Sequence, residues 1–557
     1  MRHRFVLWIV VATSLAACTN NWLSYRNSAG RYGQQFHDSE LADASKVLNN
    51  LHVGWKSPDA SWTASTMPGP FRASPIMFHK TVYIGDMNGV FWALNASDGS
   101  FQWRYPAAGS GLNGTCTLGF NGSWGAYGIQ SSASYAKIGG RAAVIFGAPD
   151  PDPATDSGNG TARLWALDAA TGSLIWKSDV VASVPTCGVG NIHERITYSS
   201  PLVAFDRVYV GVHDAADNPV QKGRLVAVDL NTGHVITSGF PFIVDGAPLD
   251  MTCGGVCGGG IWDSPATDGK GIIFTTGNVC DFNTAGSSPC ETEPNPDYSL
   301  SMVSVDPTSG ALLWSFRAVP FPLDNDPDWS AGPTSMLTSC GRLMASVQKN
   351  GWTYAIDSAN GSCKWQFPST AGPSCVFPSN AVLDQGDDDY KQPGASWGDY
   401  LYIQAAGQAL TTSLGDYPNG YGIIQSLDAC QPDDNHRVRW VAPIAPGIGY
   451  SIGAPTVTGG MVYVTTSNGH VIGLADPLIA PLSIKGWTCS NPNFSPPSPT
   501  WVADCLLNSF AIVPVPGSVD VTLDDGGDAV GLRMEPAIAH GKLFVATGQG
   551  HVYALWP

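Results

Sequence analysis

A few short segments of the chain carry the side chains best suited to chemistry. Trp262 follows three glycines and an isoleucine, Asn278 follows Thr-Thr-Gly, Lys349 lies in Gln-Lys-Asn-Gly, and Asp217 and Asp328 lie in polar stretches. An indole ring offers a large stacking face, and amide or carboxylate oxygens are hard ligands suited to calcium. A carboxylate can also accept a proton. These residues are far apart in the sequence, so their joint use requires a fold that brings them together.

Repeats are the elements that must position these residues. One pattern recurs eight times: an alternating apolar strand, a glycine turn, and a second strand ending in Ala-Leu-Asp or a similar sequence. Thr-Gly and a tryptophan then follow in most copies. Most copies are preceded by a further strand, marked by a small residue before proline as in Ser74-Pro75 and Ser200-Pro201. The pattern therefore predicts four strands per repeat.

Eight four-stranded antiparallel units arranged radially predict an all-β, eight-bladed β-propeller. The last repeat reaches Pro557 without its tryptophan strand, and residues 51–55, before the first repeat, have the sequence to replace it. We therefore expect an N-terminal strand to close the ring and one propeller domain to cover residues 45–557.

The composition agrees with a large β-protein and argues against a nucleic-acid partner. The 557 residues are 43% hydrophobic and include 64 glycines and 41 prolines, which implies many turns between short elements. The formal net charge is −17, so most of the surface would repel a polyanion.

The N-terminus has the features of an export signal. Residues 1–4 are basic, residues 5–12 are apolar, and Leu15-Ala16-Ala17-Cys18 resembles the bacterial lipoprotein box. We expect residues 1–17 to be a signal peptide, Cys18 to be lipidated, and residues 18–44 to form a tether and lead-in. An ordinary signal peptide with a chance cysteine is the alternative. Thr19 is not an inner-membrane retention aspartate, which favours the periplasmic side of a Gram-negative outer membrane.

The cysteine count predicts disulfides in an oxidising compartment. Setting Cys18 aside leaves 12 of the 13 cysteines, an even number. The sequence does not determine the connectivity, but it contains three close pairs that could form bridges: Cys280 with Cys290, Cys340 with Cys363, and Cys489 with Cys505. Cys253 and Cys257 also favour a disulfide over a zinc site.

The sequence of the repeat, clearest in residues 223–233, resembles the tryptophan-docking repeat of pyrroloquinoline quinone (PQQ) enzymes. The resemblance extends over residues 45–557. The same repeat also builds a non-catalytic lipoprotein of the outer-membrane barrel-assembly machinery, so the repeat alone does not decide the function.

The segment from Gly258 to Asn278 resembles the quinoprotein dehydrogenase stretch in which a tryptophan stacks against one face of the cofactor and an asparagine ligates the metal. The resemblance implies that Trp262 stacks on PQQ and that Asn278 binds a calcium-like ion. Lys349 matches the position where the family places a cation against the quinone carbonyl. The alternative is a core tryptophan, a turn asparagine and a solvated turn lysine of ordinary blades.

Two positions depart from the family pattern. Asp217 stands where the family usually carries a glutamate metal ligand, and Asp214 is a rival. The family's general base is an aspartate directly after a tryptophan, but here Ser330 follows Trp329. A serine hydroxyl is too weak a base to deprotonate an alcohol unaided. Asp328 would have to take over as base and lie at the metal, with Trp329 against the cofactor.

Two functions remain open from the sequence. The first is a PQQ- and calcium-dependent alcohol dehydrogenase, similar to the polyvinyl alcohol dehydrogenases. It would pass electrons to a separate acceptor such as a cytochrome c or a quinone, because the chain has no Cys-x-x-Cys-His motif for an attached haem. The second is a propeller scaffold of the cell envelope without a cofactor. Ser330 favours the scaffold, and the joint presence of Trp262, Asn278 and Lys349 favours the enzyme.

Overall fold

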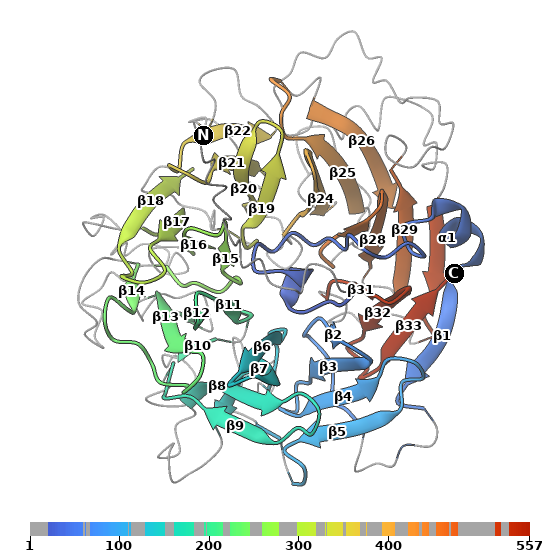
Figure 1. Cartoon of the computed structure of the whole chain (residues 1–557). Helices are drawn as coiled ribbons and strands as arrows, with labels where there is room; N and C mark the ends of the chain where they lie inside the picture. Colours follow the sequence, from blue (N-terminus) through green and yellow to red (C-terminus); the bar gives the residue numbers. More distant parts are fainter. Residues whose placement is uncertain are drawn as a thin grey trace, which may run out of the picture.

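The strands of the computed structural model form eight sheets arranged around a centre (Figure 1). The structure describes residues 20–59, 62, 67–109, 111–112, 128–150, 161–182, 194–196, 198–214, 223–244, 259–277, 298–318, 329, 331–348, 352–367, 375, 393–406, 422–433, 437–444, 453–466, 469–476, 518–524 and 534–557. The predicted all-β, eight-bladed propeller is confirmed.

Blades 1–4 follow one another along the chain, and in each of them the first strand lies nearest the centre. Blade 1 contains β2 (Ile76–Phe78), β3 (Thr81–Gly85), β4 (Phe91–Asn95) and β5 (Phe101–Tyr105). Blade 2 contains β6 (Ser134–Ile138), β7 (Arg141–Asp150), β8 (Thr161–Asp168) and β9 (Leu174–Lys177). Blade 3 contains β11 (Leu202–Ala204), β12 (Arg207–Asp214), β13 (Arg224–Asp229) and β14 (Phe242–Ile243), with β10 (Glu194–Arg195) also paired to β12. Blade 4 contains β15 (Ala266–Thr267), β16 (Ile272–Thr275), β17 (Ser301–Val305) and β18 (Leu312–Arg317).

Blades 5–8 complete the ring. Blade 5 contains β19 (Thr334–Thr338), β20 (Gly341–Val347), β21 (Thr353–Asp357) and β22 (Cys363–Phe367). Blade 6 contains β23 (Ala395–Trp397), β24 (Tyr400–Ala406), β25 (Gly422–Asp428) and β26 (Val438–Ile444). Blade 7 contains β27 (Thr456–Thr458), β28 (Met461–Thr465), β29 (His470–Ala475) and β30 (Ser518–Thr522). Blade 8 contains β31 (Ala537–Ala539), β32 (Lys542–Ala546), β33 (Val552–Trp556) and the N-terminal β1 (His52–Ser57).

Closure of the ring by an N-terminal strand is also confirmed. Strand β1 pairs antiparallel with β33, so that His52 faces Trp556 and Ser57 faces Val552. The short helix α1 (Ala44–Asn50) precedes β1, and the Asp43 side chain caps its first turn. The first and last parts of the chain therefore share one blade.

The tryptophans explain why the repeat ends with this residue. The indole N–H of the outermost strand donates to a backbone carbonyl in a turn of the next blade, at 2.8–3.3 Å. Five tryptophans make this bond: Trp55, Trp103, Trp176, Trp314 and Trp365. Each bond satisfies a buried donor, and each ring fills the space between two sheets.

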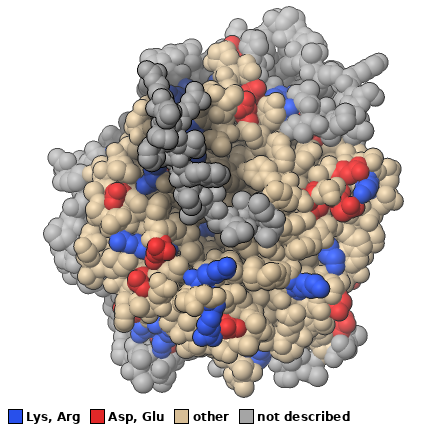
Figure 2. Space-filling view, in the orientation of Figure 1, with Lys and Arg blue, Asp and Glu red and all other residues tan. Residues whose placement is uncertain are grey.

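Antiparallel pairing gives the ring two different ends. The link from first to second strand and the link from third to fourth strand lie at one end, which we call the turn end. The link from second to third strand and the link to the next blade lie at the other, which we call the loop end. In Figure 2, on the side of the N-terminal segment, Lys and Arg groups lie around the middle of the face among scattered Asp and Glu groups.

Residues 20–38 dock inside the ring, crossing its centre in Figure 1. Inner strands of six blades each donate one backbone N–H to a carbonyl of this segment, at 2.7–2.9 Å: residues 77, 135, 267, 335, 396 and 457. Arg31 donates to the Ser200 and Pro201 carbonyls before β11, and the Gln35 amide donates to Ile538 O in β31. All eight blades therefore bind the segment, which satisfies inner-edge groups that would otherwise lack partners.

Two arginines of this segment point among the inner strands. Arg26 is fully buried and pairs with Glu535, also fully buried, at 2.8 Å. Its guanidinium also donates to the carbonyls of Gly394 and Pro455. Gly33, at φ +62°, lies against this guanidinium, and a Cβ there would overlap it. The sequence predicts a tether and lead-in over residues 18–44 and gives no sign of this docking.

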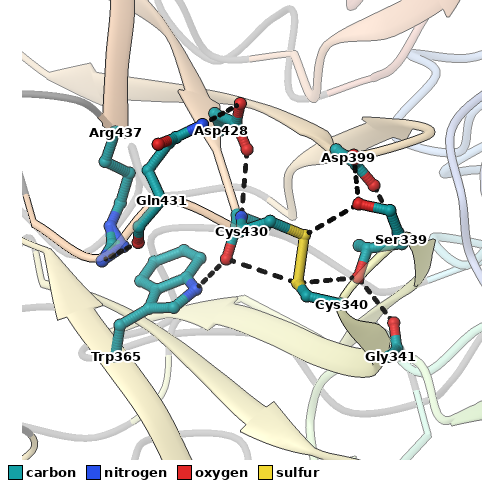
Figure 3. Close-up of a disulfide and its surroundings, with 11 residues drawn as sticks. Ser339, Cys340, Gly341, Trp365, Asp399, Asp428, Cys430, Gln431 and Arg437 are labelled. Carbon is teal, nitrogen blue, oxygen red and sulfur yellow. Dashed lines mark hydrogen bonds between the residues drawn. A yellow bond between two sulfur atoms is a disulfide. The ribbon is translucent and has the colours of Figure 1, made fainter.

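The disulfides correct one prediction. Cys340 pairs with Cys430 (Figure 3). Cys363 pairs with Cys375, so the expected Cys340–Cys363 bridge is wrong. Cys340 lies in the turn between β19 and β20, while Cys363 begins β22, two strands beyond β20. That separation of about 10 Å exceeds what a disulfide spans. The turn that follows β25 in blade 6 lies closer, with a Cα–Cα distance of 5.6 Å.

The pairs Cys280–Cys290 and Cys489–Cys505, like Cys18, Cys253 and Cys257, lie outside the described residues. No helix in the described part of the chain is long and apolar enough to span a bilayer.

Candidate functional site

Of the predicted site residues, the structure describes Trp262 and Trp329, and both lie at the loop end. Trp262 lies in the link from blade 3 to blade 4, and Asp328 and Trp329 lie in the link from blade 4 to blade 5. In sequence, the remaining candidates fall between second and third strands: Asp217 between β12 and β13, Asn278 between β16 and β17, and Lys349 between β20 and β21. Asp217, Asn278, Asp328, Ser330 and Lys349 lie outside the described residues, and the Asp214 side chain does too, so their roles stay predictions.

The described neighbours of Trp262 show which segments meet at this residue. Ile261 N–H donates to Val212 O, near the end of β12, at 3.1 Å. Gly277 N–H, directly before Asn278, donates to Gly260 O at 2.8 Å. The backbone therefore joins the Trp262 link to the strand that leads toward Asp217 and to the position before Asn278.

Two aromatic residues beside Trp262 were not assigned a role from the sequence. The His213 ring lies 6.3 Å from the Trp262 ring, and the Tyr198 ring stacks on His213 at 5.7 Å. His213 is buried, while Trp262 and Tyr198 are partly buried. His213 lies in β12, one residue before its end, so its position depends on the register of that strand rather than on a sequence motif.

Trp329 is fully buried and packs edge-on against Tyr354 at 5.5 Å. Its backbone pairs with Gln348, the residue before Lys349. Ala331 O, two residues on, accepts hydrogen bonds from Thr275 at 3.2 Å and from Ser346 at 2.6 Å. The link carrying Asp328 and Ser330 is thereby bound to blades 4 and 5. Contact between Trp329 and a cofactor stays a prediction.

Unpartnered polar atoms lie at the loop end, on the link before blade 2. The Gln130 side chain is 4% exposed, and neither its amide nitrogen nor its oxygen has a hydrogen-bond partner among the residues that the structure describes; Ser131 Oγ is likewise buried without one there. A buried polar group without a partner costs about 1–3 kcal/mol. Ser132, next in sequence, is linked to Ser200 and through it to Ser264, two residues after Trp262. These atoms are available to a polar ligand at the loop end.

Below Trp262, charged and polar groups of the N-terminal segment meet the inner ring. Burial raises the pKa of Asp263 to about 8 against the pull of the Gly332 and Ser264 backbone N–H groups. Burial also raises the pKa of Tyr25 and lowers that of Arg31 to about 10. Asp263 lies close enough to Tyr25 to raise the tyrosine pKa further. This group of side chains separates the loop end from the turn end.

Metal ligands converge nowhere in the described part of the chain, where no three His, Cys, Asp or Glu side chains come together.

Residues 22–380, more than half of the chain, match the family described as glucose/ethanol/alcohol dehydrogenase, β-propeller domain, or PQQ. The chain belongs to this PQQ β-propeller family.

Named members of the PQQ family are distant in sequence. The polyvinylalcohol dehydrogenase of Sphingopyxis sp. (strain 113P3) is 25% identical over 388 residues, covering 62% of this chain and 50% of that protein. The dehydrogenase subunit of the quinone alcohol dehydrogenase of Gluconacetobacter polyoxogenes is 22% identical over 374 residues, covering 61% and 44%. The chain spans about half the length of the curated relatives that it matches.

Solved structures confirm the fold. The quinohemoprotein alcohol dehydrogenase of Comamonas testosteroni superposes with a TM-score of 0.62 at 15% identity, covering 96% of this chain and 80% of that one. A europium-containing methanol dehydrogenase gives a TM-score of 0.60 at 15% identity, covering 97% and 98%. At this identity the likeness concerns the architecture alone.

Proposed function

We propose that the chain is a periplasmic, lipid-anchored quinoprotein that oxidises alcohol groups with PQQ and a calcium-like ion. The observation that carries the proposal is the junction at Trp262. There, backbone hydrogen bonds join the segments that lead to Asn278 and Asp217, and unpartnered Gln130 lies two blades away on the same inner ring. Membership of the PQQ family supports the choice of cofactor.

In this proposal, the side chains at the loop end hold the cofactor and the metal. Trp262 offers the stacking face; the His213 ring lies 6.3 Å from its indole, and Tyr198 stacks on His213. Asn278 and Asp217 supply oxygen ligands to the cation. Lys349 places positive charge where a quinone oxygen becomes negative. PQQ, when bound, accepts the hydride of the alcohol carbon.

The proton of the alcohol needs a base in the link between blades 4 and 5. Ser330 is too weak a base, so we assign this role to Asp328. The hydrogen bonds to Ala331 O from two blades restrain the link and would limit how far this carboxylate can move from the substrate. Electrons then leave to a separate acceptor, since the chain has no haem-attachment motif.

Binding is tested by mixing the purified Cys18→Ser protein with PQQ and calcium, desalting, and recording the ultraviolet–visible spectrum. We expect a retained quinone absorbance, which Trp262→Ala should abolish and Trp262→Phe should largely preserve, because phenylalanine keeps a stacking face. Lys349→Ala is tested in the same way, and its control is Lys364→Ala, which changes an exposed lysine at the turn end. A wild-type protein that retains no quinone would refute the cofactor assignment.

Catalysis is tested by alcohol-dependent dye reduction with primary, secondary and polymeric alcohols. Asp328→Asn should abolish turnover while the quinone stays bound, because an amide cannot accept the proton. If the wild type binds quinone but is inactive, and Ser330→Asp produces turnover, the base assignment is wrong. The chain is then a member of the family that binds quinone but has lost catalysis.

A further inference from the structure

The N-terminal segment begins at the turn end of the ring. The Asn21 side-chain oxygen accepts from His79 N–H at 2.9 Å and lies 3.3 Å from His540 Nε2. His79 and His540 belong to the turns between first and second strands of blades 1 and 8. Asn20 donates to Asp38 at 3.1 Å, and Asp38 also accepts from Gly541 N–H. Residue 20 is therefore fixed beside the turns, close to the centre of this face.

This position restricts where a lipid on Cys18 can lie. Two residues of fully extended chain span at most about 7 Å, so an acyl group on Cys18 is tethered within that distance of Asn20. The Trp262 site lies at the opposite end of the ring, beyond the buried side chains of Tyr25 and Arg26. A membrane that holds this lipid therefore meets the turn end and not the loop end.

The turn end also has side chains that suit a membrane surface. A cavity of about 740 Å³ lies beside residues 21–37 and is lined by Leu23, Phe36, Phe78 and Tyr135 among others. Phe36 is 61% exposed, and Leu337 on β19 is 64% exposed. Exposed aromatic and aliphatic groups at such positions enter the headgroup region of a bilayer.

Basic side chains lie among these apolar groups. Exposed Lys80, Lys137 and Lys270 lie in or beside the turns between first and second strands of blades 1, 2 and 4. Figure 2 shows Lys and Arg groups around the middle of this face. Aspartates are present too, but Asp229 and Asp306 accept the N–H groups of their own turns. Lysines at this distance from an anionic bilayer attract its headgroups.

We propose that the turn end of the propeller rests on the phospholipid surface that holds the Cys18 lipid, with the loop end facing the aqueous phase. The inference depends on the proposed lipid anchor and adds an orientation to the proposed function. It also selects among partners: the alcohol and the electron acceptor must both reach the loop end through water. A soluble acceptor protein fits this arrangement, and a quinone dissolved in the bilayer does not.

Lysine acylation in the two states of the protein tests the orientation. The full-length lipidated protein is reconstituted in vesicles of phosphatidylethanolamine and phosphatidylglycerol, and Cys18→Ser protein is kept in solution. Both are treated with a water-soluble N-hydroxysulfosuccinimide acetate, and the rate at each lysine is measured by mass spectrometry. The controls are Lys56 and Lys177, whose ammonium groups pair with Asp524 and Asp150 at the loop end.

We expect Lys80, Lys137 and Lys270 to react at least threefold more slowly on vesicles, and the rates at Lys56 and Lys177 to stay unchanged. Leu337→Asp should reduce the protection of Lys270, whereas Met67→Asp, at an exposed loop-end position, should not. Protection at Lys56 and Lys177 instead, equal protection at both ends, or failure of the protein to float with the vesicles would overturn the proposal.

Quinone binding and dye reduction are measured separately on the soluble Cys18→Ser protein. Loss of activity there refutes the enzyme assignment and leaves the acylation pattern unaffected. An unprotected turn end refutes the orientation and leaves the enzyme assignment intact.

Discussion

Two halves of the inner ring are joined by different means. From blade 8 to blade 4, the residue two positions before each inner strand follows one rule. Its backbone N–H donates to the hydroxyl of the serine that lies two positions before the inner strand of the next blade. Glu535 donates to Ser74, Ser74 to Ser132, Ser132 to Ser200, and Ser200 to Ser264, all at 2.9–3.0 Å. This half is a chain of four similar neutral bonds.

In blades 5–7 the corresponding residues are Gly332, Pro393 and Ala454, which carry no hydroxyl. There, Arg26 of the N-terminal segment binds the carbonyls before β23 and β27 and the Glu535 carboxylate of blade 8. The Cys340–Cys430 disulfide joins blades 5 and 6 at the turn end. The repeat closes one half through its own residues, and the other half depends on a few long-range links.

The largest effect is expected at Arg26. Arg26→Met leaves the Glu535 carboxylate buried without its partner, which should lower the free energy of unfolding by about 3–5 kcal/mol. Chemical denaturation followed by tryptophan fluorescence measures the loss. Arg26→Met combined with Glu535→Gln should recover part of it, because the uncompensated charge is gone. A single variant as stable as the wild type would show that the two halves do not differ in this way.

Removal of the disulfide should have the next largest effect. Cys340→Ser together with Cys430→Ser opens a loop with a sequence separation of 90 residues, which should cost about 2–4 kcal/mol. Differential scanning calorimetry compares the variant with the wild type. The variant combining this change with Ser200→Ala should show additive losses, since the sites lie in different halves. A loss below that of Ser200→Ala alone would contradict the comparison.

Asp263 lies where the serine chain ends, and it makes the stability depend on pH. Its pKa rises from the ordinary 3.8 to about 8 on folding, so the folded state holds the proton more tightly than the unfolded state. Stability is then lost as the pH rises from about 4 through 8. Asp263→Asn should raise the melting temperature by about 3 °C at pH 8 and change it little at pH 4. Equal shifts at both pH values would show that Asp263 is not held protonated.

The smallest effect is expected within the serine chain. Ser200→Ala removes the acceptor of Ser132 N–H and should cost about 1–2 kcal/mol, because the neighbouring links remain. Ser100→Ala, in an exposed turn, serves as the control and should change stability by less than about 0.5 kcal/mol. Urea denaturation of both variants gives the difference. A cost as large as that of Arg26→Met would mean that the serine chain fails as a unit.

The same contrast explains what the sequence could predict. Ser-Pro pairs and tryptophans recur at fixed positions, so the four-stranded blade, the number of blades and the closing strand followed from periodicity. The Arg26–Glu535 pair joins residues 509 positions apart and does not recur in the repeats. Periodicity therefore could not predict it. The Cys340–Cys430 bridge was missed for a related reason: adjacency of turns in neighbouring blades matters more than closeness in sequence.

For the site, the sequence selected Trp262, Asn278 and Lys349, and of these the structure describes Trp262, which lies at the loop end. It gave no sign that Gln130 and Ser131 would be buried without partners, because that property depends on the packing of a neighbouring blade. The role of His213 likewise depends on its distance from Trp262, which follows from the register of β12.

Docking of residues 20–38 on all eight blades has a consequence for the order of folding. This segment is synthesised first, yet its partners extend to Ile538. The carbonyls of the segment therefore stay solvated until the last blade has been synthesised, and the entropy of closing a loop of about 500 residues is lost in a late step. Chains cut short within blade 8 should accumulate as open, protease-sensitive arcs rather than as smaller rings.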